Sequence, residues 1–193
     1  MPSLLPRSVP RTITDPLVHF LARLGLSPNH LTIVGGLGNI GTAVLAGRGQ
    51  FLAAGLLLLG ASALDLLDGA LARATGRASR FGSILDATVD RISEGAVLFG
   101  LIVWFSGRGQ REEVLLAAAA IIGSFLVSYV RARSEIVGLV LREGLFTRAE
   151  RVFVLGLGLI IDQVTIALWV LAVVANLTAG QRLWLAWRGT QRP

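Results

Sequence analysis

Long apolar blocks, separated by short polar or glycine-containing segments, run through most of the chain. Blocks of this length with few internal charges are typical of helices that cross a bilayer. They predict six spans, over residues 31–47, 51–73, 81–105, 114–137, 148–161 and 164–187. We therefore expect an all-α membrane protein with six transmembrane helices, folded as a single domain over residues 1–193.

A shorter amphipathic segment precedes these blocks. Residues 14–25 place Leu17, Phe20, Leu21 and Leu24 at the spacing of one apolar helical stripe. A helix of this length rises only about 18 Å, whereas the hydrocarbon core is about 30 Å thick. We therefore expect an N-terminal amphipathic helix that lies in the membrane interface.

The fifth block is short for a span. Residues 148–161 rise about 21 Å as a helix, after a predicted capping box formed by Thr147 and Glu150. Asp162-Gln163 then interrupts the apolar pattern before the last block. Residues 148–187 are therefore either two spans or one broken span.

The distribution of arginine favours an even number of spans. With six spans, the loops on one side hold only three arginines, Arg48, Arg108 and Arg111. The other side then holds Arg7, Arg11, Arg77, Arg80, Arg142, Arg148, Arg188 and Arg192. Because basic loops stay in the cytoplasm, we expect both termini and this side to be cytoplasmic, in a bacterial plasma (inner) membrane.

Composition supports a membrane protein and excludes other classes. Hydrophobic residues make up 53% of the chain and charged residues 16%, and the mean hydropathy is +0.69. The net charge is +6, with arginine as the only basic residue apart from two histidines. No basic stripe with interleaved aromatics is present, so we expect no nucleic-acid partner. With no cysteine, disulfides and thiolate metal ligands are excluded.

Four acidic residues interrupt the second and third blocks. Asp65 and Asp68 follow the apolar run 51–64, and Asp86 and Asp90 lie in the next block. A charge at a helix centre costs about 2.5–3.5 kcal/mol on insertion scales. Salt bridges to nearby arginines at the membrane edge would explain one such acid, but four acids in 26 positions favour a functional site.

The spacing of these acids places them on two helical faces. Asp65, Asp68, Gly69, Ala72 and Arg73 share one face, and Gly82, Asp86 and Asp90 share another. Two helices joined by a short loop bring such faces together, and like charges converge only when cations intervene. Carboxylate oxygens favour hard ions such as Mg²⁺, Mn²⁺ or Ca²⁺, and paired metals are usual in diphosphate chemistry. Gly69 and Gly82 leave room for close approach of a ligand to the backbone.

The complete pattern resembles the signature of the CDP-alcohol phosphotransferase family. It reads Asp65-x2-Asp68-Gly69-x2-Ala72-Arg73-x8-Gly82-x3-Asp86-x3-Asp90, with no position missing. The resemblance implies two divalent cations, Mg²⁺ or alternatively Mn²⁺, held by Asp65, Asp68, Asp86 and Asp90, with Asp90 also acting as general base. It implies that CDP-diacylglycerol is bound by Asn29, His30, Leu31, Thr32, Gly69, Arg73, Ser79 and Gly82. It also implies a homodimer.

A weaker resemblance concerns the acceptor alcohol. Residues 79–93, 128–135, 150–151 and 178–182 look like the phosphatidylinositol phosphate synthases of actinobacteria, although Arg131 stands where lysine is usual and Ser134 where alanine is usual. This resemblance implies that the acceptor phosphate is bound by Ser128, Arg131, Arg133, Arg151 and Arg182. For the last three arginines, the alternative is that they reach the membrane interface without binding substrate.

These observations predict a transferase. We expect phosphatidyl transfer from CDP-diacylglycerol to inositol phosphate, giving phosphatidylinositol phosphate and CMP by a metal-assisted single displacement. Glycerol phosphate or another polyol phosphate is the alternative acceptor. A small cation transporter is a more distant alternative, because acids inside membranes often mark ion paths. A lipid-binding scaffold would not need the fourth acid.

Overall fold

The computed structural model describes Pro16, Val18 and residues 21–23, 25–76, 78–141, 144 and 146–191. Within these residues the regular secondary structure is entirely helical. The long helices are α2 (Pro28–Gly47), α3 (Phe51–Ala74), α4 (Arg80–Ser106), α5 (Arg111–Ile136), α6 (Arg148–Ile160) and α7 (Val164–Thr190). Their bounds agree closely with the six predicted blocks.

Side chains cap the helices that matter for the site. Ser27 Oγ accepts from the backbone N–H of His30 at 3.3 Å at the start of α2. Ser79 Oγ accepts from the backbone N–H of Gly82 at 2.9 Å at the start of α4. The predicted capping box of α6 is confirmed, with the N–H of Thr147 donating to Glu150 Oε2 at 2.6 Å. These caps satisfy N–H groups that the helices themselves leave free.

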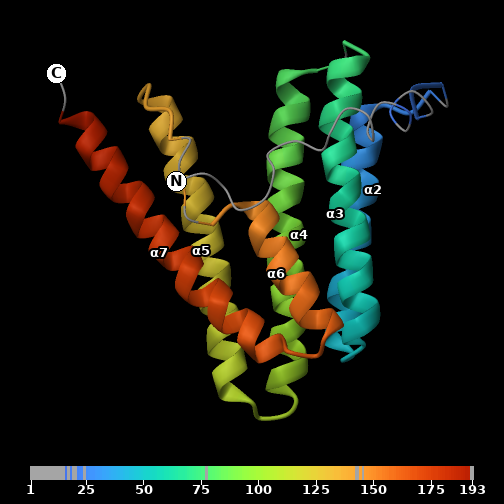
Figure 1. Cartoon of the computed structure of the whole chain (residues 1–193), viewed down its shortest axis with the longest axis vertical. Helices are drawn as coiled ribbons and strands as arrows, with labels where there is room; N and C mark the ends of the chain where they lie inside the picture. The colour runs from blue at the N-terminus through green and yellow to red at the C-terminus, as the bar shows by residue number, and fades with distance from the viewer. Residues whose placement is uncertain are drawn as a thin grey trace.

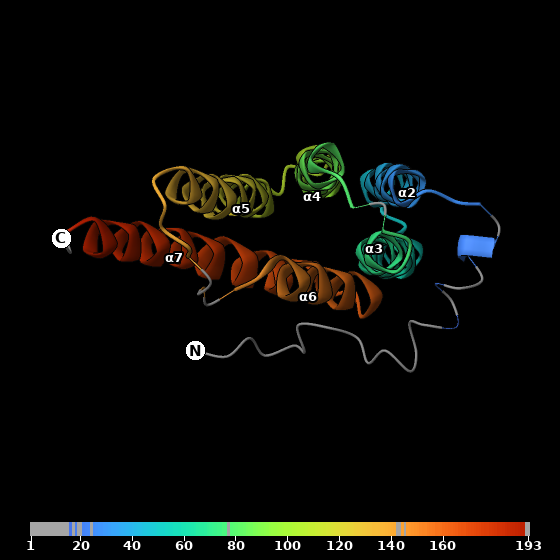
Figure 2. The ribbon, with the colours of Figure 1, turned by 90° about the horizontal axis from the view of Figure 1, so that it is seen from above.

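The six helices form two rows of three (Figures 1 and 2). Seen from above, α5, α4 and α2 form one row, and α7, α6 and α3 form the other (Figure 2). Helix α2 packs against both α3 and α4, α5 packs against α4 and α7, and α6 packs against α3 and α7. Helix α2 is thus the main neighbour of both acid-bearing helices. Helices α4 and α6 face each other at the centre, where long side chains fill the space between them.

Close packing depends on small residues at some crossings and on leucine elsewhere. A Cβ atom on Gly100 would lie 2.2 Å from the carbonyl oxygen of Ala43, so α2 and α4 touch through their backbones there. Leu98, Leu101 and Leu168 are fully buried in the main apolar cluster. Many other large apolar side chains remain exposed at the outer faces of the bundle, as expected for a surface covered by lipid.

Four helices, α2, α3, α5 and α7, are long and apolar enough to cross a membrane. Helix α6 is not among them because it is too short: its 13 residues rise about 20 Å. Helix α4 has 27 residues but carries acids and arginines in its first half. A three-residue break over 161–163 separates α6 from α7, with Asp162 in the left-handed region at φ 56°. Residues 148–187 therefore form two helices, and the six-span count stays a prediction.

Half of the predicted interfacial helix over 14–25 lies outside the described residues. Within it, residues 21–23 are helical, and Val18 is buried. Val18 packs in a small apolar cluster with Leu31 of α2 and Leu71 of α3. The described part of this segment thus contacts the bundle near the start of α2.

Candidate active site

Helix α2 supports the two acids of α3. Asp68 is 6% exposed, and its Oδ2 accepts a hydrogen bond of 2.6 Å from Thr32 Oγ1. A Cβ atom on Gly35 would lie only 2.5 Å from Asp65 Oδ1, so only glycine lets Asp65 approach α2 this closely. Helix α2 therefore accommodates the two acids of α3 in two ways. The hydroxyl group of Thr32 donates to Asp68, and the absence of a side chain at Gly35 leaves room for Asp65.

Arg148, the first residue of α6, joins the acids of α3 and α4. Its Nη2 lies 2.8 Å from Asp65 Oδ2 and 2.9 Å from Asp90 Oδ1. Arg91 lies on the other side of Asp90, with Nη2 3.8 Å from Oδ2. Asp86 lies within electrostatic range of Asp65, Asp68 and Asp90. The four acids predicted from the sequence thus belong to one electrostatic cluster, which contains a guanidinium group.

A cavity of about 260 Å³ adjoins two of these acids. It lies between the start of α2, the end of α3 and the start of α4. Its lining residues are Pro28, Asn29, Thr32, Asp68, Gly69, Ala72, Arg73, Ala78, Ser79, Gly82, Ser83 and Asp86. Six of the eight residues predicted to bind CDP-diacylglycerol line it. His30 and Leu31 do not, because His30 is exposed and Leu31 packs against Val18 and Leu71.

The predicted acceptor residues gather near α5, α6 and α7. Ser128 accepts a hydrogen bond from Arg91 Nη1. Arg182 is 7% exposed and donates from Nη1 to the carbonyl oxygen of Val127 at 2.8 Å. The charges of Arg131, Arg151 and Arg91 all act on Arg182. Three of the predicted acceptor arginines, Arg131, Arg151 and Arg182, therefore share one region with Arg91 of α4.

Arg131 and Arg133 are the exposed members of the predicted acceptor set. Arg131 Nε donates to Glu135 Oε1 at 2.9 Å, one turn along α5. An exposed pair of this kind is weak and leaves other guanidinium donors available. Of Arg91, Arg131, Arg151 and Arg182, Arg131 thus has the most exposed side chain.

Almost the whole sequence supports the assignment of this chain to one protein family. The model of the family described as CDP-alcohol phosphatidyltransferase matches residues 25–189. The chain belongs to the CDP-alcohol phosphatidyltransferase family. It is an enzyme of phospholipid synthesis, and the expectation drawn from the acid signature is confirmed.

Similar proteins of this family carry more specific names. Phosphatidylinositol phosphate synthase of Mycobacterium marinum is 36% identical to this chain over 195 residues, covering 95% of this chain and 83% of its own length. The Mycobacterium tuberculosis phosphatidylinositol phosphate synthase with CDP-DAG bound has a TM-score of 0.83 at 34% identity, covering 91% of this chain and 94% of that one. Its complex with manganese and citrate also has a TM-score of 0.83 at 34% identity, covering 90% and 88%.

The donor chemistry of this phosphatidyltransferase fits a divalent cation, although the side chains do not form a finished coordination shell. The family depends on divalent cations, and four carboxylates supply the oxygen ligands that such ions prefer. Among the described residues, no three acidic or histidine side chains stand close enough together to hold a metal ion. Arg148 lies between Asp65 and Asp90 instead. A metal ion could bind both carboxylates only if Arg148 released at least one of them.

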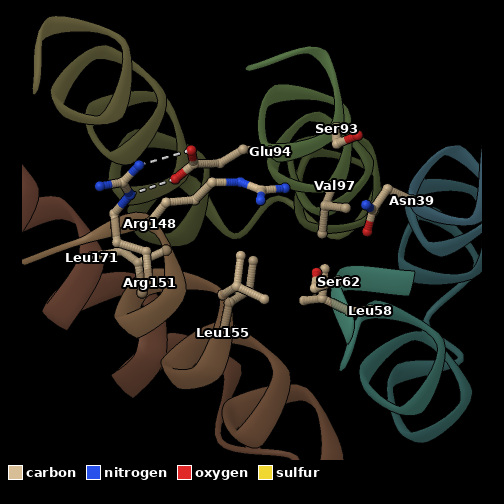
Figure 3. A pocket seen from close by; sticks show the side chains of 11 residues that line it. Asn39, Leu58, Ser62, Ser93, Glu94, Val97, Arg148, Arg151, Leu155 and Leu171 are labelled. Carbon is tan, nitrogen blue, oxygen red and sulfur yellow. Dashed lines mark hydrogen bonds and ion pairs between the residues drawn. The ribbon is translucent and has the colours of Figure 1, made fainter. Parts of the chain in front are cut away.

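Glu94 and Arg148 were not among the site residues predicted from the sequence. Glu94 of α4 pairs with Arg151 of α6 through two contacts, Nε to Oε1 at 2.5 Å and Nη2 to Oε2 at 2.9 Å (Figure 3). Arg151 also donates from Nη1 to the carbonyl oxygen of Phe146 at 3.3 Å. Arg151 is only 2% exposed, so its guanidinium already has three protein contacts. Its predicted role in binding the acceptor phosphate stays a prediction.

Proposed function

We propose that this phosphatidyltransferase moves the phosphatidyl group of CDP-diacylglycerol to inositol phosphate, giving phosphatidylinositol phosphate and CMP. The observation that carries the proposal is the acid cluster beside a cavity lined by the signature residues. The names of the similar synthases support the acceptor, because they share a third or more of their residues with this chain over most of its length.

The cavity between α2, α3 and α4 is the proposed site of the CDP group. Arg73 supplies a fixed positive charge for the diphosphate, since a guanidinium stays protonated at all physiological pH values. A Cβ atom on Gly82 would lie 3.0 Å from Ser79 Oγ and 3.2 Å from Asn29 Oδ1. Because glycine has no side chain at this position, the polar groups of Ser79 and Asn29 stay accessible to a nucleotide in the cavity.

The acids carry the proposed chemistry. Two divalent cations, Mg²⁺ or Mn²⁺, held by Asp65, Asp68, Asp86 and Asp90 would neutralise the diphosphate and stabilise the charge on departing CMP. Asp90 takes the proton of the attacking hydroxyl group on a carboxylate oxygen. The hydroxyl oxygen forms a bond to the phosphatidyl phosphorus, and the bond from that phosphorus to the CMP oxygen breaks. CMP leaves with the electron pair, so protons and charge balance in a single displacement.

The arginine cluster is the proposed site of the acceptor phosphate. The charges of Arg131, Arg151 and Arg91 all act on Arg182, and gathering like charges is costly unless anions compensate them. A phosphate group offers the oxygens that guanidinium groups bind best. The cluster favours a phosphorylated acceptor over a free polyol. It does not by itself distinguish inositol phosphate from glycerol phosphate.

A panel of acceptors tests the proposal. Purified protein in detergent receives CDP-diacylglycerol, Mg²⁺ and one of inositol phosphate, glycerol phosphate or free inositol, and CMP release is measured. We expect release with inositol phosphate and little with the other two. Release with glycerol phosphate alone would keep the chemistry and change the acceptor. Equal release with free inositol would contradict the role of the arginine cluster.

Replacing Arg131 by glutamine is expected to raise the KM for inositol phosphate by about tenfold or more, because a hydrogen bond to a charged group contributes about 1.5–3 kcal/mol. The KM for CDP-diacylglycerol should change little, since Arg131 does not line the donor cavity. Arg111→Gln, at the opposite end of α5, is the matched control. An equal rise for both substrates would contradict the assignment of Arg131.

The proposed membrane arrangement has six spans with both termini and the donor cavity in the cytoplasm of a bacterial inner membrane, after an interfacial N-terminal helix. Two features support it. The connections α2–α3, α4–α5 and α6–α7 lie at one end of the bundle, and the connection α3–α4 and the end of α7 lie at the other (Figure 1). The arginine-poor loops belong to the first group. We also propose a homodimer, on the family resemblance alone.

A further inference from the structure

Arg148 occupies a central place among the acids, and the signature assigns it no role. A single nitrogen, Nη2, contacts Asp65 of α3 at 2.8 Å and Asp90 of α4 at 2.9 Å. Its side chain is 23% exposed, whereas those of the two acids are 8% and 12% exposed. Arg148 therefore brings a positive charge from α6 to two carboxylates that α3 and α4 hold on opposite sides of it.

The backbone that carries Arg148 is firmly fixed. Thr147 and Glu150 cap the first turn of α6. Arg151, one turn further on, ties the same turn to Glu94 of α4 by two contacts (Figure 3). A second, smaller pocket lies between α4 and α6, and Arg148 extends past this pair toward the side of it where Asn39 and Ser62 lie (Figure 3). Its position near the acids is thus imposed by the start of α6.

The guanidinium of Arg148 itself is less firmly held than that of Arg151. Arg151 uses Nε, Nη1 and Nη2 in contacts with Glu94 and Phe146. By contrast, Nε of Arg148 is buried without a hydrogen-bond partner in the described part of the chain. The Arg148 head group is therefore anchored mainly by the two carboxylates, and it can swing away when another cation takes them.

We propose that Arg148 is an internal counter-ion of the acid cluster and competes with the divalent cation for Asp65 and Asp90. The inference rests on the proposed function, which assigns these two acids to the metal. A metal ion binds carboxylate oxygens at about 2.0–2.6 Å, and a guanidinium on the same two carboxylates would lie close enough to repel it. Metal binding therefore moves Arg148 off at least one of the acids. The arginine lowers metal affinity and keeps the acids compensated between turnovers.

Titration of the purified full-length protein with Mn²⁺ tests this competition, with free Mn²⁺ followed by electron paramagnetic resonance. Arg148→Gln is expected to bind Mn²⁺ about tenfold more tightly than the wild type, because the competing charge is gone. With a chelator present, the variant should unfold at a lower temperature, and Mn²⁺ should raise that temperature more than it does in the wild type. A merely structural role for Arg148 would lower stability without tightening Mn²⁺ binding.

Arg91→Gln is the matched control, because Arg91 is a nearby cation that, among the four acids of the cluster, pairs only with Asp90, at a longer distance of 3.8 Å. Its gain in Mn²⁺ affinity should be clearly smaller than that of Arg148→Gln. An equal gain would show a general effect of charge and overturn the proposal, as would unchanged or weaker Mn²⁺ binding by Arg148→Gln.

Arg148→Lys keeps the test decisive if the glutamine variant does not fold. A lysine ammonium group lacks the planar fork of arginine, so we expect a smaller gain, of about threefold. The absence of any gain would overturn the proposal. If the wild type binds no Mn²⁺, the metal assignment of the proposed function fails as well. If the wild type binds Mn²⁺ and releases CMP while the variants gain nothing, only the role of Arg148 fails.

Discussion

Replacing Asp90 by asparagine is expected to lower the rate of CMP release by about 10²–10⁴-fold, the range usual for loss of a general base. Asparagine keeps the shape of the side chain, but it cannot take the proton of the acceptor hydroxyl group and is a poorer metal ligand. The amide oxygen can still accept a hydrogen bond from Arg148, but the ion pair that Asp90 Oδ1 makes with Arg148 at 2.9 Å is lost. The loss should appear mainly in kcat.

Asp162→Asn is the matched control for this variant. Asp162 is exposed and lies in the turn between α6 and α7, at a left-handed φ that asparagine tolerates well. Its activity should equal that of the wild type. Measuring Mn²⁺ binding by Asp90→Asn separates loss of the base from loss of a ligand. If Asp90→Asn keeps more than about a tenth of the wild-type rate, Asp90 is not the general base.

Replacing Glu94 by glutamine is expected to lower the free energy of unfolding by about 3–5 kcal/mol, the usual effect of removing one member of a buried ion pair. Arg151, at 2% exposure, would then carry a charge without its carboxylate partner inside the bundle. Because this pair joins α4 to α6 (Figure 3), its loss should also loosen the start of α6. Unfolding in detergent, followed by tryptophan fluorescence, measures the change.

Glu135→Gln gives the matched comparison, because it breaks the exposed contact to Arg131. Exposed pairs one helical turn apart contribute only about 0.3–0.5 kcal/mol. A second comparison is the double variant Glu94→Gln with Arg151→Met, which removes both charges and should recover part of the lost stability. Similar losses for Glu94→Gln and Glu135→Gln would contradict the proposed role of the buried pair.

The helices of this chain can be predicted from the sequence because local signals determine where they begin and end. Apolar blocks fix their extent, and turn residues such as Gly49 and Gly109, both at positive φ, mark their ends. The capping box of Thr147 and Glu150 marks the start of α6, and Asp162-Gln163 marks the break before α7. Each of these signals acts within a few residues, so no knowledge of the packing is needed.

Part of the proposed donor cavity can also be predicted from the sequence, because half of its lining residues belong to one compact signature. Asp68, Gly69, Arg73, Gly82 and Asp86 fall within a short stretch of the chain, and all five line the cavity. The spacing of the residues along two consecutive helices already predicts which of them share a face.

The contacts between distant helices were not predictable. Arg148 lies 83 positions from Asp65, and Arg151 lies 57 positions from Glu94. Nothing in the local pattern indicates that α6 faces α4 across the centre of the bundle. The expectation that α3 and α4 meet directly was also incomplete, because α2 is the main neighbour of both. Packing of helices in two rows decides these partners, and a single sequence does not encode that arrangement in any local spacing.

The most direct test of the account is the metal dependence of CMP release by the purified protein with CDP-diacylglycerol and inositol phosphate. We expect a chelator to abolish release, Mg²⁺ or Mn²⁺ to restore it, and Asp90→Asn to stay about 10²–10⁴-fold slower in their presence. Release that persists in the chelator would contradict a metal-dependent acid cluster. Absence of release under all conditions, together with cation flux through the protein in liposomes, would contradict phosphatidyl transfer and favour an ion path.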